Sequence, residues 1–204
     1  MIRVLNYEGK TEEEALEKAL KQLKLTRENI IIKSEYVEGK LFKGSKYILS
    51  VIIKEEILDY IKQYINIIAT KMNISIDCDV SIHEDNFNIT LVSDNNSILI
   101  GKEGRTLNAI QLLIRQSIKN QTTLNIKLNV DIANYKLKKL KNIENQVKKI
   151  ANEILKTKID VSLDSMNSYE RRLVHSIINE YSNLETESIG EGKDRHIVIK
   201  YIEK

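Results

Sequence analysis

The stretch ILIGKEGRTLNAIQ, residues 98–111, places two glycines three positions apart between two segments whose apolar residues have helical spacing. Because Gly101 and Gly104 carry no Cβ atom, the backbone between them can approach a phosphodiester chain closely. A helix that begins at Arg105 offers free N–H groups and the positive end of its dipole to a phosphate, and Lys102 adds charge. The pattern therefore predicts a loop that holds phosphate. A plain turn between helices, with glycines only for positive φ angles, is the alternative.

The residues on either side of this loop predict a unit of order α-β-β-α-α-β. Apolar residues recur at helical spacing in 55–72 and 105–119, and 95–100 predicts a short helix before the glycines. Alternating apolar residues predict strands at 74–83, 87–92 and 124–132. A type II KH domain, a small RNA-binding fold, places its Gly-x-x-Gly loop between the second and third helices of this order. That position favours a phosphate-holding loop over a plain turn.

The first part of the chain predicts a small β-α-β-β unit. Thr11 and Glu14 form a capping box at the start of its helix. Strands are expected at 2–7, 30–37 and 47–54. Gly39 and Gly44 indicate a turn between the last two strands. A unit of about 50 residues is near the lower limit for folding alone.

The last part of the chain predicts an α/β unit that begins with a long basic helix, residues 135–158. Asn167 and Glu170 form a second capping signature, and the helix that follows is expected to reach about Tyr181. Strands are expected at 160–163, 185–189 and 196–202, the last two as a hairpin. The fold class is therefore α+β with three small domains, expected at 1–54, 55–133 and 134–204.

Arg171 and His175 lie four residues apart on this second helix, about 40° apart around its axis. Their strip borders the apolar arc of the helix, so both side chains can hold one phosphate; the alternative is that each bonds a nearby carbonyl. Arg195, at the start of the last strand, adds charge nearby or lies at a solvated strand end. The lysines of the long helix are interpreted either as a track for an RNA backbone or as a solubilising face: Lys136, Lys138, Lys139, Lys141, Lys148 and Lys149.

The net charge of the chain, +3 over 204 residues, is too small to indicate nucleic acid by itself. Residues 1–54 carry 11 Lys and Arg against 8 Asp and Glu, residues 55–132 carry 7 against 10, and residues 133–204 carry 14 against 11. The central unit is therefore acidic, and a polyanion has to be held by local patches.

Other classes of protein are disfavoured by what the sequence lacks. Cys78 is the single cysteine, so no internal disulfide can form, and none of the three His stands in a ligand spacing with it. No Walker loop, dinucleotide fingerprint or nucleophile elbow is present, so we expect no cofactor, no metal and no enzymatic activity. The first residues lack the apolar core of a signal peptide, and Lys62 and Lys71 interrupt the most apolar stretch, 60–76. We expect a cytoplasmic protein without a membrane span.

Three stretches of the chain match the motifs of one bacterial family. Residues 98–111 are similar to the pattern IGKxGxTLxALQ, with Ile110 in place of its second Leu, and residues 166–175, MNSYERRLVH, match MNxYERRxVH. Residues 186–192, TESIGEG, followed by Arg195, match TxSxGxG, and Gly9-Lys10-Thr11 gives a weaker N-terminal match. With these stretches the chain resembles the Jag family, also called KhpB or SpoIIIJ-associated proteins, in which the first two patterns are the KH and R3H motifs.

The resemblance implies a Jag N-terminal domain, a type II KH domain and a C-terminal R3H domain, with single-stranded RNA bound by the last two. The residues implied at the RNA belong to these motifs: Gly101, Lys102, Glu103, Gly104, Arg105, Arg171, Arg172, His175 and Arg195. A regulatory role, in some bacteria in cell elongation and envelope growth, and a small KH-only protein partner are also implied. Single-stranded DNA as the ligand, and a protein-interaction scaffold with vestigial nucleic-acid surfaces, are the alternatives. The sequence leaves the oligomeric state open.

Four features depart from the family pattern. Glu103 puts a negative charge where a basic or neutral residue is usual, and Ser165 replaces the usual Pro before the R3H helix. The Arg-rich segment of the family is represented by Tyr135–Lys139, and almost no linker separates the first domain from the KH domain. Because of Glu103 and the acidic central unit, we expect the KH domain alone to bind RNA weakly and tight binding to need KH and R3H in tandem.

Overall fold

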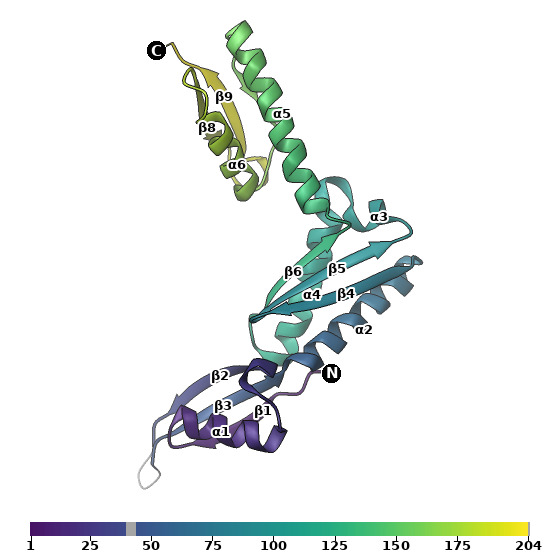
Figure 1. Cartoon of the computed structure of the whole chain (residues 1–204), viewed down its shortest axis with the longest axis vertical. Coiled ribbons are helices and arrows are strands. Elements are labelled where there is room, and N and C mark those ends of the chain that lie inside the picture. Colours follow the sequence, from purple (N-terminus) through teal and green to yellow (C-terminus); the bar gives the residue numbers. More distant parts are fainter. Residues whose placement is uncertain (40–43, 204) are drawn as a thin grey trace. The chain divides into compact units, whose positions relative to one another are not determined.

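The computed structural model describes residues 1–39 and 44–203, and it divides the chain into two compact units, Met1–Ala133 and Asn134–Lys204 (Figure 1). Part of the turn expected around Gly39 and Gly44 lies outside the described residues. The mixed α and β class predicted from the sequence is confirmed. Within the described ranges, no helix is both long and apolar enough to cross a membrane.

The N-terminal part is a three-stranded antiparallel sheet covered on one face by a helix. Its elements are β1 (Leu5–Gly9), α1 (Glu12–Leu23), β2 (Ile30–Val37) and β3 (Lys46–Ile53), with strand order β1-β3-β2. Ala15 and Ala19 of α1 are fully buried against the sheet. The cap of α1 differs from the predicted box: Thr11 accepts from the Glu14 N–H, but the Glu14 carboxylate accepts from the N–H of Lys10 instead of Thr11.

The central part has the predicted order α-β-β-α-α-β. Its elements are α2 (Lys54–Met72), β4 (Ile76–His83), β5 (Asn86–Ser93), α3 (Asn96–Ile100), α4 (Arg105–Thr122) and β6 (Lys127–Ile132). Strand β5 is the middle strand, antiparallel to β4 and parallel to β6. One face of the sheet is apolar, with Phe87 and Leu91 fully buried, and α2 and α4 cover it with a row of isoleucines. This packing fixes the connection between α3 and α4, where the two glycines lie.

The first two parts form one compact unit because several contacts join them. Helix α2 follows β3 with no intervening residue. The N–H of Ile2, itself buried, donates to the side-chain carbonyl of Gln121 on α4 at 3.0 Å, and Arg3 forms an ion pair with Glu56 on α2. Burial alone would raise the pKa of Glu56, but hydrogen bonds from the Arg3 guanidinium and backbone lower the pKa below its usual value. The N-terminal segment is thus fastened to two helices of the central part.

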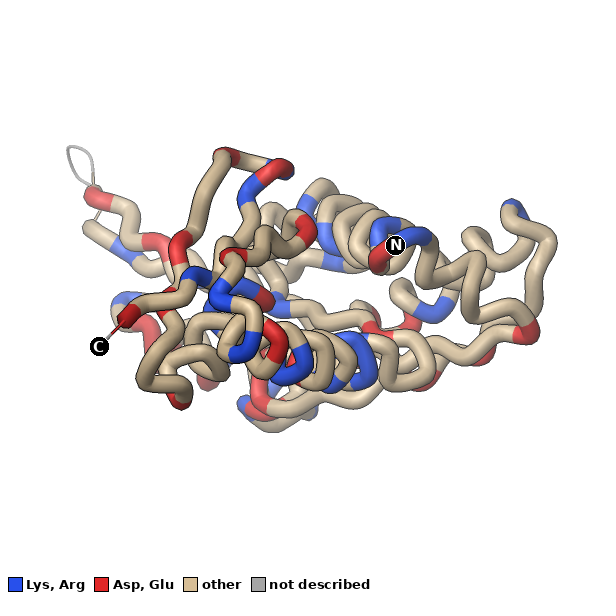
Figure 2. The backbone as a smooth tube through the Cα atoms, turned by 90° about the horizontal axis from the view of Figure 1, so that it is seen from above, with Lys and Arg blue, Asp and Glu red and all other residues tan. Residues whose placement is uncertain are grey.

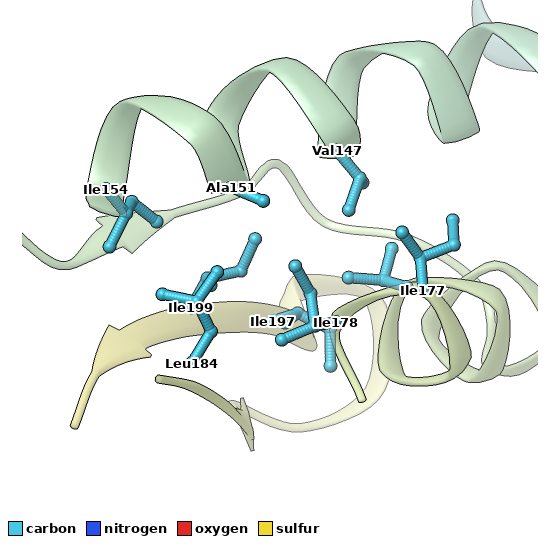
Figure 3. Close-up of a cluster of buried hydrophobic side chains, with 9 residues drawn as sticks. Val147, Ala151, Ile154, Ile177, Ile178, Leu184, Ile197 and Ile199 are labelled. Atoms are coloured by element: carbon cyan, nitrogen blue, oxygen red, sulfur yellow. The ribbon is translucent and has the colours of Figure 1, made fainter. Parts of the chain in front are cut away.

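The C-terminal unit packs two helices against a three-stranded antiparallel sheet. Its elements are α5 (Tyr135–Thr157), β7 (Val161–Ser162), α6 (Ser168–Ile178), β8 (Leu184–Ile189) and β9 (His196–Tyr201), with strand order β7-β9-β8. Figure 3 shows Val147, Ala151 and Ile154 of α5 directed at the side chains of α6 and β9. Burial of these aliphatic groups contributes most of the driving force that holds α6 in place.

Helix α6 ends three residues before the expected Tyr181. The N–H of Tyr181 donates to the carbonyl of Ile178 at 2.9 Å, and the N–H of Glu180 donates to that of Ile177 at 3.2 Å. These i to i+3 bonds tighten the last turn and stop the helix before β8 begins at Leu184. The chain then turns back into β8, which contacts α6.

Candidate nucleic-acid interface

The glycine loop, Gly101–Gly104, connects α3 to α4 through a short 3-10 turn. Gly101 has φ 69° and ψ 179°, and a Cβ atom there would lie 2.2 Å from the hydroxyl oxygen of Thr106. Gly104 has φ 83° and lies in the left-handed region immediately before α4. Both positions therefore require glycine, the first for close approach to α4 and the second for its backbone conformation. The backbone of the loop lies tightly against the first turn of α4.

The charges predicted for this loop are exposed at its surface. Lys102, Glu103 and Arg105 all face solvent. Glu103 has φ 55°, and its carboxylate lies 3.8 Å from the guanidinium of Arg105. An exposed ion pair of this kind is weak, so an incoming phosphate can compete with Glu103 for Arg105. Ile98, on α3 just before the loop, is 45% exposed and adds an apolar surface that a base can contact.

The second group of predicted residues depends on how α6 begins. The Asn167 side chain accepts from the N–H groups of Tyr169 and Glu170 at 2.9 and 3.0 Å, and the Glu170 carboxylate accepts from the Asn167 N–H at 3.0 Å. This is the capping box that the sequence predicted. Glu170 is also buried and forms an ion pair with Lys139 of α5 at 2.7 Å. The first turn of α6 is therefore fixed to α5, and the side chains that follow it are held in position.

Arg171 and His175 are both half-buried, and the side chain of each bonds a neighbouring residue. Arg171 donates from one terminal nitrogen to the carbonyl of Met166 at 2.8 Å. The Nδ1 atom of His175 is hydrogen-bonded to the hydroxyl of Thr186 on β8. A guanidinium carries five N–H donors and an imidazole has two ring nitrogens. Arg171 thus bonds a nearby carbonyl, as the alternative expected, whereas His175 bonds a hydroxyl. A ligand role is compatible with both contacts, because among the described residues further N–H groups of Arg171 and Nε2 of His175 have no bond.

Strand β8 brings a further predicted residue to the same place. Thr186 and Ser188 are two apart on β8 and so face the same side of the strand. Ser188 accepts from the Nε of Arg195 at 3.0 Å, while Thr186 bonds His175. Arg172 is exposed and lies three residues before His175, next to it on the helix surface. The structure thus groups Arg171, Arg172, His175 and Arg195, which we call the Arg/His site.

The residues that position these groups stand in the quoted motif stretches, but the sequence predicted no role for them. Thr186 and Ser188 orient His175 and Arg195, and Thr106 packs on the glycine loop. Gln111 of α4 accepts from the N–H of Val130 on the outer edge of β6 at 3.0 Å. The sequence held a signal for Thr186 and Ser188, because two small hydroxyl residues stand two positions apart and so share one side of β8. None existed for the contact of Gln111 with β6.

Lys and Arg positions lie among Asp and Glu positions along the backbone, and neither sign covers a whole compact unit (Figure 2). Across the residues that the structure covers, no group of three or more His, Cys, Asp and Glu side chains is arranged to hold a metal ion. The glycine loop and the Arg/His site belong to different compact units. Each of the two groups of predicted residues is therefore built within its own unit.

Comparison with known proteins assigns most of the chain to three family models. Residues 7–33 match "Jag N-terminus", residues 58–132 match "KhpA/KhpB, KH domain", and residues 141–201 match "R3H domain". A Clostridium symbiosum protein named "RNA-binding protein KhpB" is 34% identical over 198 residues, covering 94% of this chain and 88% of the relative. The protein of the same name from Bacillus subtilis (strain 168) is 29% identical over 206 residues, covering 98% of this chain and 99% of the relative.

Proposed function

The chain belongs to the KhpB family of RNA-binding proteins, and from this premise we propose that it binds single-stranded RNA through two phosphate-holding sites. The glycine loop with Lys102 and Arg105 is one site, and the Arg/His site is the other. The observation that carries the proposal is the clustering of cationic and imidazole groups around β8, where Thr186 and Ser188 orient His175 and Arg195. Prepositioned donors of this kind hold a phosphate without first having to be ordered.

At the glycine loop, the backbone contacts one stretch of the RNA strand. The absence of side chains at Gly101 and Gly104 lets the strand come close, and Lys102 supplies a mobile positive charge. Arg105 binds a phosphate once that phosphate has displaced the Glu103 carboxylate from the guanidinium. Ile98 then lies beside the bases. This site therefore contacts mainly the sugar-phosphate backbone of the RNA strand.

At the Arg/His site, the donors act on one or two phosphates. Arg171 contributes the N–H groups not used on Met166, and His175 contributes Nε2. Arg172 and Arg195, both exposed, neutralise the same stretch of backbone. No base edge is read by these groups, so binding is expected to be tolerant of sequence.

The lysines of α5 extend this positive surface only in part. Lys139 and Lys148 are engaged in ion pairs with Glu170 and Glu144. Exposed lysines on the side of α5 away from the core include Lys138, Lys141 and Lys149. We propose that these three form a secondary track for the RNA backbone.

The proposal is tested by fluorescence anisotropy with a labelled single-stranded RNA over a series of salt concentrations. Wild-type chain, Lys102→Asp and the double variant Arg171→Ala/His175→Ala are compared, with Lys21→Asp on α1 as a control of equal charge change. Both site variants should bind more weakly, with a shallower dependence of log K on log salt, because fewer counterions are released. Lys21→Asp should match wild type. Absence of binding by wild type, or wild-type affinity in both site variants, would overturn the proposal.

A matched DNA strand in the same assay addresses the alternative ligand. We expect unlabelled RNA to displace the labelled strand more strongly than DNA of the same sequence does, because the 2′-hydroxyl supplies additional hydrogen bonds. Equal competition would favour a general binder of single strands.

A protein-interaction role is the second candidate, and one observation favours it. Leu112 and Leu113 of α4 are 61% and 52% exposed, an adjacent apolar pair on the surface of the KH domain. We propose that a protein, such as a small KH-only partner, covers this pair. Leu112→Asn/Leu113→Asn should keep RNA affinity and lose binding to a purified KH-only protein from the same organism. Binding that persists would exclude this surface.

We propose that RNA binding serves a regulatory role in cell elongation and envelope growth, as the family resemblance implies. A strain that carries the Arg171→Ala/His175→Ala chain in place of wild type should differ in mean cell length from its parent. Wild-type cell length at equal protein abundance would contradict this role.

A further inference from the structure

Tyr169 is the most exposed tyrosine of the chain. Seven of the nine tyrosines are at least partly covered, and only Tyr36 and Tyr169 are exposed, at 53% and 64%. The ring of Tyr36 contacts the ring of Tyr47 with centroids 5.1 Å apart. The ring of Tyr169 has no aromatic or hydrogen-bonding partner among the residues that the structure describes. The aromatic face of Tyr169 is therefore open to solvent, and a ligand could contact it there.

The backbone that carries this ring is firmly placed. The N–H of Tyr169 donates to the Asn167 side chain at 2.9 Å, in the first turn of α6. The next residue, Glu170, points into the core and is paired there with Lys139. A tyrosine side chain has only two torsions, so its ordering on binding costs little entropy. The backbone that carries the ring is thus held in place, and only two side-chain torsions have to be ordered when a ligand binds.

Tyr169 stands in line with the Arg/His site. Tyr169, Arg172 and His175 are spaced three residues apart, so they follow one another along one ridge of α6. The single acidic residue between them, Glu170, faces the core and does not oppose a phosphate. A strand that followed this ridge over His175 and Arg172 would come next to the ring of Tyr169.

We propose that Tyr169 is a stacking platform for one base of the RNA strand held at the Arg/His site; this rests on the proposed function. The phenol ring offers a π-face to any base, so it adds affinity without reading sequence, and purines with their larger rings stack better than pyrimidines. The phosphate contacts fix the path of the strand, and the ring holds a base in an unpaired, splayed conformation. The site would then select single strands over duplexes.

The absence of Trp from the chain allows a direct spectroscopic test. Tyr169→Trp introduces one tryptophan whose fluorescence a stacked base quenches, and Tyr36→Trp places a matched tryptophan at the other exposed tyrosine. On titration of the full chain with a single-stranded adenosine oligonucleotide, Tyr169→Trp should be quenched and Tyr36→Trp should not. An oligonucleotide with abasic positions should bind without quenching. Equal quenching in both variants, or none in either while RNA binds, overturns the inference.

Affinity measurements separate stacking from charge. Tyr169→Ala should weaken RNA binding about tenfold, within the range for one base stacked on an aromatic ring, while Tyr169→Phe should bind like wild type. The salt dependence should be the same in all three chains, because no phosphate contact is lost. If wild type binds RNA and Tyr169→Ala binds equally well, the stacking inference fails and the proposed function stands. If wild type does not bind, both fail.

Discussion

Glu103 is an unusual residue at its position in the glycine loop. Its φ of 55° lies in the left-handed region, which costs a residue with a Cβ atom about 1–2 kcal/mol. Most other non-glycine residues of this kind cap helices, as Asn73 and Lys158 do. Glu103 caps none, and it holds a carboxylate against Arg105. The residue thus reduces both the stability of the loop and its positive charge.

We predict that Glu103→Asn binds RNA about fivefold more tightly than wild type. Asn tolerates positive φ, and the change removes a negative charge whose repulsion of a phosphate at about 4 Å amounts to roughly 1 kcal/mol in water. Glu84→Asn is a matched control, since Glu84 also has a positive φ, 56°, in the β4–β5 turn. Anisotropy at low salt measures the affinities. The prediction is wrong if Glu103→Asn binds no better than Glu84→Asn.

Thr186 is a small residue whose role depends on one hydrogen bond. Thr186→Val keeps the shape of the side chain and removes the hydroxyl that holds His175 Nδ1. We predict severalfold weaker RNA binding and a loss of about 1 kcal/mol in the stability of the C-terminal unit. Thr186→Ser should restore both. NMR of the imidazole nitrogens reports the tautomer directly; an unchanged tautomer and affinity in Thr186→Val would show that Thr186 does not orient the ring.

Helix α6 is anchored to α5 at its first turn by an ion pair between buried Glu170 and half-buried Lys139. Glu170 is 5% exposed and bonds both Lys139 and the Asn167 N–H. We predict that Glu170→Ala destabilises the C-terminal unit by about 3 kcal/mol, because a cation loses its buried partner and α6 loses its cap. Hydrogen exchange should quicken in α6 and stay the same in β4–β6. Glu144→Ala removes an exposed pair with Lys148 and serves as the control.

In that control variant, exchange throughout α6 should match wild type, since exposed pairs contribute little. Equal protection of α6 in Glu170→Ala and wild type would show that apolar packing alone holds the helix.

Helix α4 also has a role at the edge of its sheet. Gln111 accepts from the N–H of Val130, and Arg115 donates to the carbonyl of Leu128 at 3.0 Å, so both side chains satisfy outward-facing groups of β6. An uncovered edge strand can pair with a strand of another chain. Gln111, part of the stretch that resembles the KH motif, therefore protects the sheet edge.

At the scale of the whole molecule, the two proposed sites belong to separate compact units, Met1–Ala133 and Asn134–Lys204. Linking two weak sites on one chain raises the overall affinity by a large factor through effective concentration. We predict that residues 1–133 alone bind a long single-stranded RNA about 100-fold more weakly than the full chain, and that adding residues 134–204 as a separate fragment does not restore affinity. Titration by anisotropy measures this. A 1–133 fragment as tight as the full chain would contradict tandem binding.

The order of elements was determined by the sequence, because it depends on local spacing. Helical periodicity predicted α2, α4 and α5, alternation predicted β4 and β5, and the Asn167 cap predicted the start of α6. The sequence also identified the two glycines of the loop, because a short connection between two adjacent helices requires positive φ angles, which glycine adopts readily. Lys102, Arg171 and His175 were named as candidates from local spacing, and Arg172 was named from the family resemblance. Tyr169 was not named.

The partners of those side chains were decided only by tertiary structure. His175 meets Thr186, Arg195 meets Ser188, and Glu170 meets Lys139, each across two elements whose approach no local pattern specifies. Ile2 of the N-terminal segment bonds Gln121, 119 positions away. Contacts of this kind join the first two parts into one compact unit. Local interactions fix where helices and strands form, whereas burial of apolar surface between elements fixes which side chains meet.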